Sequence, residues 1–250
     1  MIFAIASREL KTLFISPLAW SILAVLQLIL AYLFLTQIET FTSIQAQLAN
    51  IDNAPGLTDI IVLPLFGNAS IMLLLITPIL TMRLVSEERR NKTLSLLLSA
   101  PLSSTEIILG KFFGILGMLT IIVLLISLMP LSLLIGGELD LGKFACNILA
   151  LSLLVSAFAS IGLYMSCIAS HPTIAAISSF GLLLLLWVLD WTAGLENQQD
   201  SLFNYLSILK HFQNIQSGLL NSVDISYFLL FTATFLILSI RRLDNDRLQK

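Results

Sequence analysis

The chain has 250 residues, of which 57% are hydrophobic and 11% charged, and its formal net charge at pH 7 is -2. Soluble domains carry about 25% charged residues, so this composition excludes an ordinary soluble protein and indicates an integral membrane protein. The small negative charge gives no indication of nucleic-acid binding.

The first residues combine charges with apolar residues at helical spacing. Arg8, Glu9 and Lys11 interrupt the apolar pattern and no small-residue cleavage site follows, so the sequence does not predict a cleavable signal peptide. We predict an amphipathic helix over residues 1–16 that lies on the membrane surface. The alternative is that these residues form the first turns of the first spanning helix. The apolar positions are Ile2, Phe3, Ile5, Ala6, Leu10 and Leu13.

Long apolar segments predict an all-α membrane protein with six spanning helices in a single domain over residues 1–250. Ser103 and Glu106 form a capping box that starts the third helix in water. We therefore expect the first turns of this helix, which include Lys111, to project into the cytoplasm. Asp224 is predicted to be the N-cap of the sixth helix. The predicted spans cover residues 17–38, 59–85, 105–135, 141–169, 173–191 and 224–240.

The distribution of basic residues predicts the orientation. The N-terminal arm, the segment between the second and third spans and the C-terminal tail together hold eleven of the 13 lysines and arginines, all on one side of the predicted topology. Only Lys143 and Lys210 fall on the other side. The positive-inside rule then places both termini in the cytoplasm.

Two features complete the predicted topology. The external segment over residues 192–223 is too apolar for a free loop, so we expect one or two short helices there, at the outer leaflet. Cys146 and Cys167 lie in one predicted helix, about 30 Å apart by helical rise, which is too far for a disulfide bond. We expect both to be buried apolar fillers.

The sequence holds no pattern typical of a catalytic or metal site. The phosphate-binding loop pattern fails around Gly110-Lys111, because Phe112 follows and position 105 is not a glycine. His171 is interpreted as a turn residue, and His211 as a polar residue at the membrane interface. Asp190 stands between two tryptophans typical of an interfacial belt; it is either a solvated helix end or a functional intramembrane acid.

Glycines suggest one packing contact. Gly110 and Gly114 form a small-xxx-small pair on the third span, which favours close helix packing over a functional role.

The segment over residues 86–104 is the most informative part of the chain. Ser86-Glu87-Glu88-Arg89-Arg90-Asn91-Lys92 is a dense charge cluster in a chain with few charges. A solvated turn on the positive side of the membrane would explain the arginines. It would not explain the leucines that follow, which need a surface to bury against. A short amphipathic helix that docks on a soluble partner would supply that surface.

The same segment resembles the signature of ABC-2 type transporter permeases. The resemblance rests on Glu87-Glu88-Arg89, Thr93-Leu94, Leu96-Leu97-Leu98, Pro101-Leu102 and Gly110-Lys111. The entry Arg8-Glu9-Leu10, with Ser16-Pro17, and the stretch from Tyr205 to Phe228 resemble the gliding-motility-type branch of that family. The chain departs from the pattern at Asn91-Lys92, where the family has a glycine before the threonine, and at Ser95, where glutamate is common.

This resemblance implies a type V exporter-like permease fold and a set of partners. Two ATPase subunits would bind ATP and Mg²⁺, and this chain would hold neither cofactor nor metal. A second permease copy or a paralogue would complete the membrane part, and an auxiliary membrane protein with an external domain could accompany it, in the bacterial inner membrane. The residues over 1–16, with Arg8, Glu9 and Lys11, would be an elbow helix. The coupling contacts with the ATPase would come from Glu87, Glu88, Arg89, Thr93, Leu94, Leu97, Leu98 and Pro101.

Two other functions stay open at the level of sequence. One is a membrane anchor or energy-transducing subunit of a larger envelope complex that transports nothing itself. The other is a membrane enzyme, which would need polar residues clustered at one depth. The polar candidates belong to separate segments, namely Glu39, Asp59, Asp190 and His211.

Overall fold

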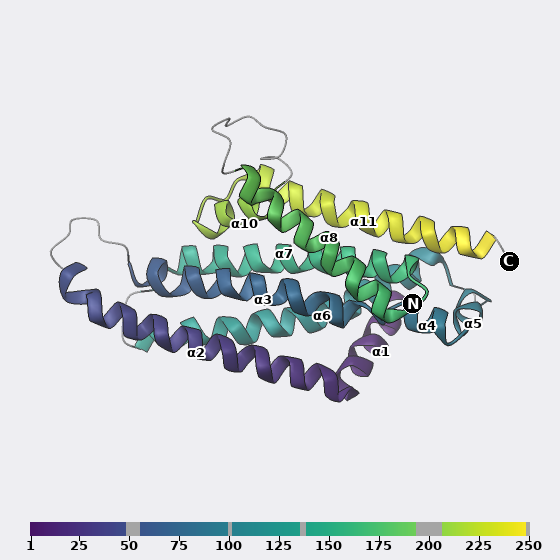
Figure 1. The fold of residues 1–250 in the computed structure, drawn as a ribbon, viewed down its shortest axis with the longest axis horizontal. Coiled ribbons are helices and arrows are strands. Elements are labelled where there is room, and N and C mark those ends of the chain that lie inside the picture. The colour runs from purple at the N-terminus through teal and green to yellow at the C-terminus, as the bar shows by residue number, and fades with distance from the viewer. Residues whose placement is uncertain (49–55, 100–101, 136–138, 194–206, 249–250) are drawn as a thin grey trace.

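The computed structural model describes residues 1–48, 56–99, 102–135, 139–193 and 207–248. Within these ranges the chain is helical apart from short connections, and no strand occurs. Long helices lie side by side and give an elongated molecule (Figure 1). The elements are α1 (Ile2–Ile15), α2 (Pro17–Leu48), a π-helix (Thr58–Val62) that continues into α3 (Leu63–Thr81), α4 (Ser86–Arg90), α5 (Leu94–Ser99), α6 (Ser104–Leu131) with a 3-10 turn (Ser132–Ile135), α7 (Leu141–Ile168), α8 (Pro172–Ala193), α10 (Ile208–Gln216) and α11 (Ser222–Leu248).

Five stretches are long and apolar enough to cross a membrane. They cover Pro17–Gln45, Thr58–Arg90, Ser104–Leu134, Leu141–Ile168 and Ser222–Leu248. The apolar part of α8 over Pro172–Val188 is shorter, although α8 contacts α4 at one end and α10 at the other. The chain is therefore a multi-pass membrane protein, and a sixth crossing by α8 stays a prediction.

α7 is the centre of the bundle. It contacts α3, α6, α8, α10 and α11. Its buried face carries small residues that include Ala150, Ala157 and Gly162, and small residues allow helix backbones to approach closely in membranes. A Cβ atom on Gly162 would lie 2.0 Å from Oγ1 of Thr81, so α3 and α7 touch at this point.

The elongated molecule has two different ends (Figure 1). α1, α4, α5 and the C-terminal end of α11 gather at one end, and α10 lies at the other. Both termini therefore lie at the same end of the molecule (Figure 1), and the cytoplasmic orientation of that end stays a prediction.

The predicted helices lie where the structure has helices, but some of the predicted helix ends differ from those of the structure. α6 and α7 begin within one residue of their predicted starts, and the capping box of Ser103 and Glu106 is present. α2 continues ten residues beyond the predicted end at Ile38, because hydropathy marks where a bilayer ends and not where a helix ends. α10 is the short helix expected in the external segment, whose residues 194–206 lie outside the described part.

The predicted N-cap role of Asp224 is wrong. α11 begins at Ser222, so Asp224 lies in the first turn of the helix, where it is buried. Its carboxylate bonds to Nδ1 of His211 on α10, and the His211 ring stacks on Tyr227. The pair connects α10 to α11.

Candidate functional site

The candidate site is the charged segment that links α3 to α6. After the turn at residues 82–85, α4 forms little more than one helical turn, and α5 follows after Asn91, Lys92 and Thr93. Lys92 has a φ angle of 58°. This left-handed conformation favours glycine. The family pattern that the chain resembles has a glycine at this position, directly before the threonine, and the backbone conformation gives a physical reason for it.

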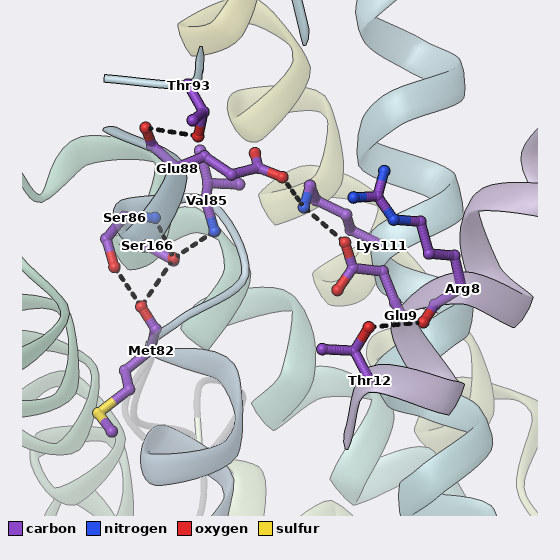
Figure 2. Close-up of polar contacts among 10 residues, drawn as sticks. All are labelled: Arg8, Glu9, Thr12, Met82, Val85, Ser86, Glu88, Thr93, Lys111 and Ser166. Carbon is purple, nitrogen blue, oxygen red and sulfur yellow. Dashed lines mark hydrogen bonds and ion pairs between the residues drawn. The ribbon is translucent and has the colours of Figure 1, made fainter. Parts of the chain in front are cut away.

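A serine hydroxyl group on α7 binds the backbone of the turn that leads into α4. Ser166 Oγ accepts hydrogen bonds from the backbone N–H groups of Val85 (3.0 Å) and Ser86 (3.1 Å), and donates to the carbonyl of Met82 (3.1 Å). Figure 2 shows these three contacts converging on one side chain. The bonds give partners to two buried backbone N–H groups at the start of α4.

A lysine on α6 joins the segment to α1. Lys111 Nζ lies 2.7 Å from Oε1 of Glu88 and 2.7 Å from Oε1 of Glu9, and only 2% of the Lys111 residue surface is exposed. Figure 2 shows the ammonium group between the two carboxylates. A buried ammonium ion is stable only when it is paired, so α1, α4 and α6 depend on one another at this point.

An arginine joins the same short helix to α7 and α11. Arg89 donates to the carbonyl oxygen of Cys167 over 2.7 Å and forms an ion pair with Asp246. The neighbouring Arg247 donates to the carbonyl oxygen of Leu102, just before α6, over 2.8 Å. The C-terminal turns of α11 therefore contact both ends of the charged segment.

Glycines bring α1 close to α6. A Cβ atom on Gly110 would lie 2.6 Å from Cβ of Ile5, and one on Gly114 would lie 2.7 Å from Cβ of Glu9. The sequence predicted helix packing for these two glycines, and they provide it. The same close approach places Glu9 within reach of Lys111.

The predicted interface residues lie in different environments. Glu88 and Arg89 face partners within the chain, and Leu94 is buried in the core. Glu87 is half-buried and lies 3.7 Å from Arg90, Thr93 is exposed, and Leu97 packs partly against the core. The side chain of Leu98 and the whole of Pro101 lie outside the described part. On α1, Arg8 and Lys11 are exposed, whereas Glu9 faces Lys111.

Some paired residues could not be found from the sequence. The partners of Lys111 are 23 and 102 positions away in sequence, and those of Arg89 are 78 and 157 positions away. The only available signal was that an isolated lysine in an apolar run requires a counter-ion. At the other end of the molecule, Lys143 Nζ lies 2.7 Å from Oδ1 of Asp59, and both side chains are partly exposed.

Comparison with known proteins places the chain in a family. The model of the ABC-2 family transporter proteins matches residues 3–247. A search of curated proteins finds no match. The family match covers almost the whole chain, including the charged segment and every helix described above. The chain therefore belongs to the ABC-2 transporter family, as a membrane permease subunit of an ABC transporter.

Proposed function

We propose that this permease couples ATP hydrolysis on a partner subunit to a conformational change in its membrane helices, through the charged segment. Membership of the ABC-2 family implies an ATP-binding partner in general. Two such subunits would hold ATP and Mg²⁺ and dock on the α4–α5 end, which would face the cytoplasm. A second copy or a paralogue of this chain would complete the membrane part.

The observation that supports this proposal is the set of contacts that α4 makes. A helix of five residues is connected through Glu88, Arg89 and the turn before it to α1, α6, α7 and α11. A partner that moved α4 would therefore move four other helices. When one helix of a packed bundle is displaced in this way, the bundle changes from one discrete arrangement of its helices to another.

Two polar atoms of α4 are unsatisfied by the described residues in this arrangement of the helices. Glu88 Oε2 and Arg89 Nε are buried and have no hydrogen-bond partner among the described residues. Each such deficit costs roughly 1–3 kcal/mol. If α4 moved so that these atoms gained hydrogen-bond partners, the free energy gained would offset part of the free energy lost when the present contacts of α4 break.

The docking surface would be the outward side of the segment. Glu87 and Thr93 have exposed area there, so they are the predicted contacts that fit this role best. Glu88, Arg89 and Leu94 would keep the segment rigid, and the contributions of Leu97, Leu98 and Pro101 stay predictions. The crossing of α8, the elbow role of α1, the bacterial inner membrane, the gliding-motility-type branch and an auxiliary external protein are further parts of the proposal.

The test is a distance measurement in the complex with its ATP-binding subunit. Spin labels at Leu134 and Leu219, both exposed and close to the end opposite α4, report movement there. We expect ATP to change the label distance in the parent complex. The Arg89→Gln variant should still bind and hydrolyse ATP in the complex but lose this change, whereas Arg241→Gln, an exposed position on α11, should keep it. An unchanged distance in every nucleotide state would contradict the proposal and favour an anchor that transports nothing.

A further inference from the structure

A cavity of about 210 Å³ lies where α1, α2 and the end of α3 meet. Its polar lining comes from Glu9, Thr12 and Ser16 on or just after α1, and from Arg83 and Glu87 beside the start of α4. The rest of the lining is aliphatic and comes from α1, α2, α3 and the turn after α3. The cavity is therefore polar at the α4 end of the molecule and apolar toward the bundle.

An apolar groove lies next to this cavity, farther along α2 and α3. It has a volume of about 300 Å³ and is lined by residues such as Ile22 and Val25 on α2 and Leu75 and Ile76 on α3. On α2, Ala19 lines the cavity and Ile22 the groove; on α3, Ile79 lines the cavity and Ile76 the groove. These pairs are three residues apart, which is about one helical turn, so the groove begins about one turn beyond the cavity on the same two helices.

The length of this path corresponds to one leaflet. The lining on α2 runs from Leu18 to Ile29, which is about 16 Å at the rise of an α-helix. The hydrocarbon core of a bilayer is about 30 Å thick. A path with a polar head and an apolar tail of this length has the shape of one lipid molecule in the leaflet on the α4 side.

The charges at the head of the path identify the class of lipid. Arg83 is exposed and makes no hydrogen bond or ion pair with any described residue, so its guanidinium can bind a phosphate. Glu9 is paired with Lys111, but that lysine also serves Glu88, which leaves one negative charge in excess. Among the described residues, the Glu87 carboxylate has one ion-pair contact, a long one of 3.7 Å with Arg90. A purely anionic headgroup would place its charge beside these carboxylates, whereas a primary ammonium group would donate hydrogen bonds to them.

We propose that the path formed by α1, α2 and α3 binds one phospholipid with a zwitterionic, primary-amine headgroup, such as phosphatidylethanolamine. Arg83 binds the phosphate, Glu87 accepts from the ammonium group, and one acyl chain lies in the groove along Val25 and Leu75. A lipid bound there would fix α1 against the start of α4. The docking proposal also uses Glu87, so the tests below change Arg83 and Val25, which docking does not use, and either proposal can fail without the other.

The experiment uses the full chain in bilayers that contain equal amounts of phosphatidylethanolamine, phosphatidylcholine and phosphatidylglycerol. The protein is released into mild detergent and its retained lipids are identified by native mass spectrometry. We expect one phosphatidylethanolamine per chain, preferred about tenfold over each of the others, and a loss of about tenfold in Arg83→Gln, which corresponds to one charge-assisted hydrogen bond. Arg241→Gln is the matched control and should retain the lipid.

A second pair of variants tests the groove. Val25 is 59% exposed and Leu230, on α11, is 68% exposed, so neither Val25→Trp nor Leu230→Trp should disturb the core. Val25→Trp should fill the groove and reduce retention, whereas Leu230→Trp should not. A preference for phosphatidylglycerol, or equal retention by Arg83→Gln, would overturn the proposal. So would a change of oligomeric state in Val25→Trp with lipid retention unchanged, because a second copy would then cover the groove.

Discussion

The Nζ atom of Lys111 lies 2.7 Å from the carboxylate of Glu88, although the lysine is two turns inside an apolar helix and the glutamate belongs to a surface segment. A second carboxylate, from Glu9 on α1, lies at the same distance on the lysine. One ammonium group thus connects three helices, and only 2% of the surface of Lys111 is exposed. The charged segment is therefore part of the bundle and not a loop attached to it.

Replacing this lysine should destabilise the protein. Lys111→Met leaves the carboxylates of Glu9 and Glu88 next to each other without a cation, and breaking a buried pair is costly. Because both carboxylates keep some exposure, we expect a loss of roughly 2–3 kcal/mol, seen as a lower unfolding temperature in detergent.

The double variant provides the control for this effect. Lys111→Met with Glu88→Gln removes one of the uncompensated charges, so it should recover part of the lost stability. The sum of the two single effects should exceed the effect of the double variant. Additive effects would show that Lys111 and Glu88 do not interact.

A glycine pair on α6 allows a matched comparison. The Cβ added in Gly114→Ala would lie 2.7 Å from Cβ of Glu9 and 3.1 Å from the backbone oxygen of Ala6, so α1 must move. The Cβ added in Gly117→Ala would lie 3.5 Å from the flexible end of Leu10, which is an ordinary contact. We expect Gly114→Ala to cost about 1–2 kcal/mol and Gly117→Ala to be neutral or stabilising by up to about 1 kcal/mol through helix propensity.

Limited proteolysis of α1 distinguishes the two variants. Displacement of α1 in Gly114→Ala should expose the connection at Ser16 and speed cleavage, whereas Gly117→Ala should be cleaved like the parent. Equal cleavage of the parent, Gly114→Ala and Gly117→Ala would mean that α1 does not pack against α6 at Gly114.

Restoring the glycine of the family pattern at position 92 should stabilise the protein. Its φ angle of 58° carries a cost for any side chain with a Cβ, and glycine avoids that cost. We expect Lys92→Gly to stabilise the protein by about 0.5–1 kcal/mol, measured by thermal unfolding. Asn91→Gly is the control, because Asn91 has a φ of -81° and gains nothing from glycine; it should be slightly destabilising. Destabilisation by Lys92→Gly would contradict the assigned backbone conformation.

The contact between α3 and α7 should not tolerate a methyl group. In Gly162→Ala the added Cβ would lie 2.0 Å from Oγ1 and 2.7 Å from Cβ of Thr81, deep in the bundle. Overpacking of this kind costs about 1–3 kcal/mol, and Thr81→Ala in the same chain should relieve only part of it, because the Cβ of residue 81 stays 2.7 Å from the added Cβ. Gly181→Ala on α8 is the control, because no atom lies within 4 Å of the added Cβ. Equal unfolding temperatures for the two glycine variants would be inconsistent with the packing of α7.

The sequence predicted those features that depend on neighbouring residues. Hydropathy located the long helices because each must satisfy its own backbone in lipid, and the spacing of Ser103 and Glu106 defined the start of α6. Features that depend on distant residues were missed. Asp224 had the right type and place for an N-cap, but a buried partner on α10, His211, uses its carboxylate instead. The apolar character of Leu94 suggested a partner protein, whereas the core of this chain buries it.

Photo-crosslinking tests the central claim most directly. A photoreactive side chain replaces Glu87, at the α4 end, and in a second protein it replaces Leu219, which is 67% exposed near α10 at the other end. After illumination of the assembled transporter, docking on the charged segment predicts a covalent adduct with the ATP-binding subunit from position 87 and none from position 219. An adduct from position 219, or none from position 87 while the complex remains intact, would contradict docking through this segment.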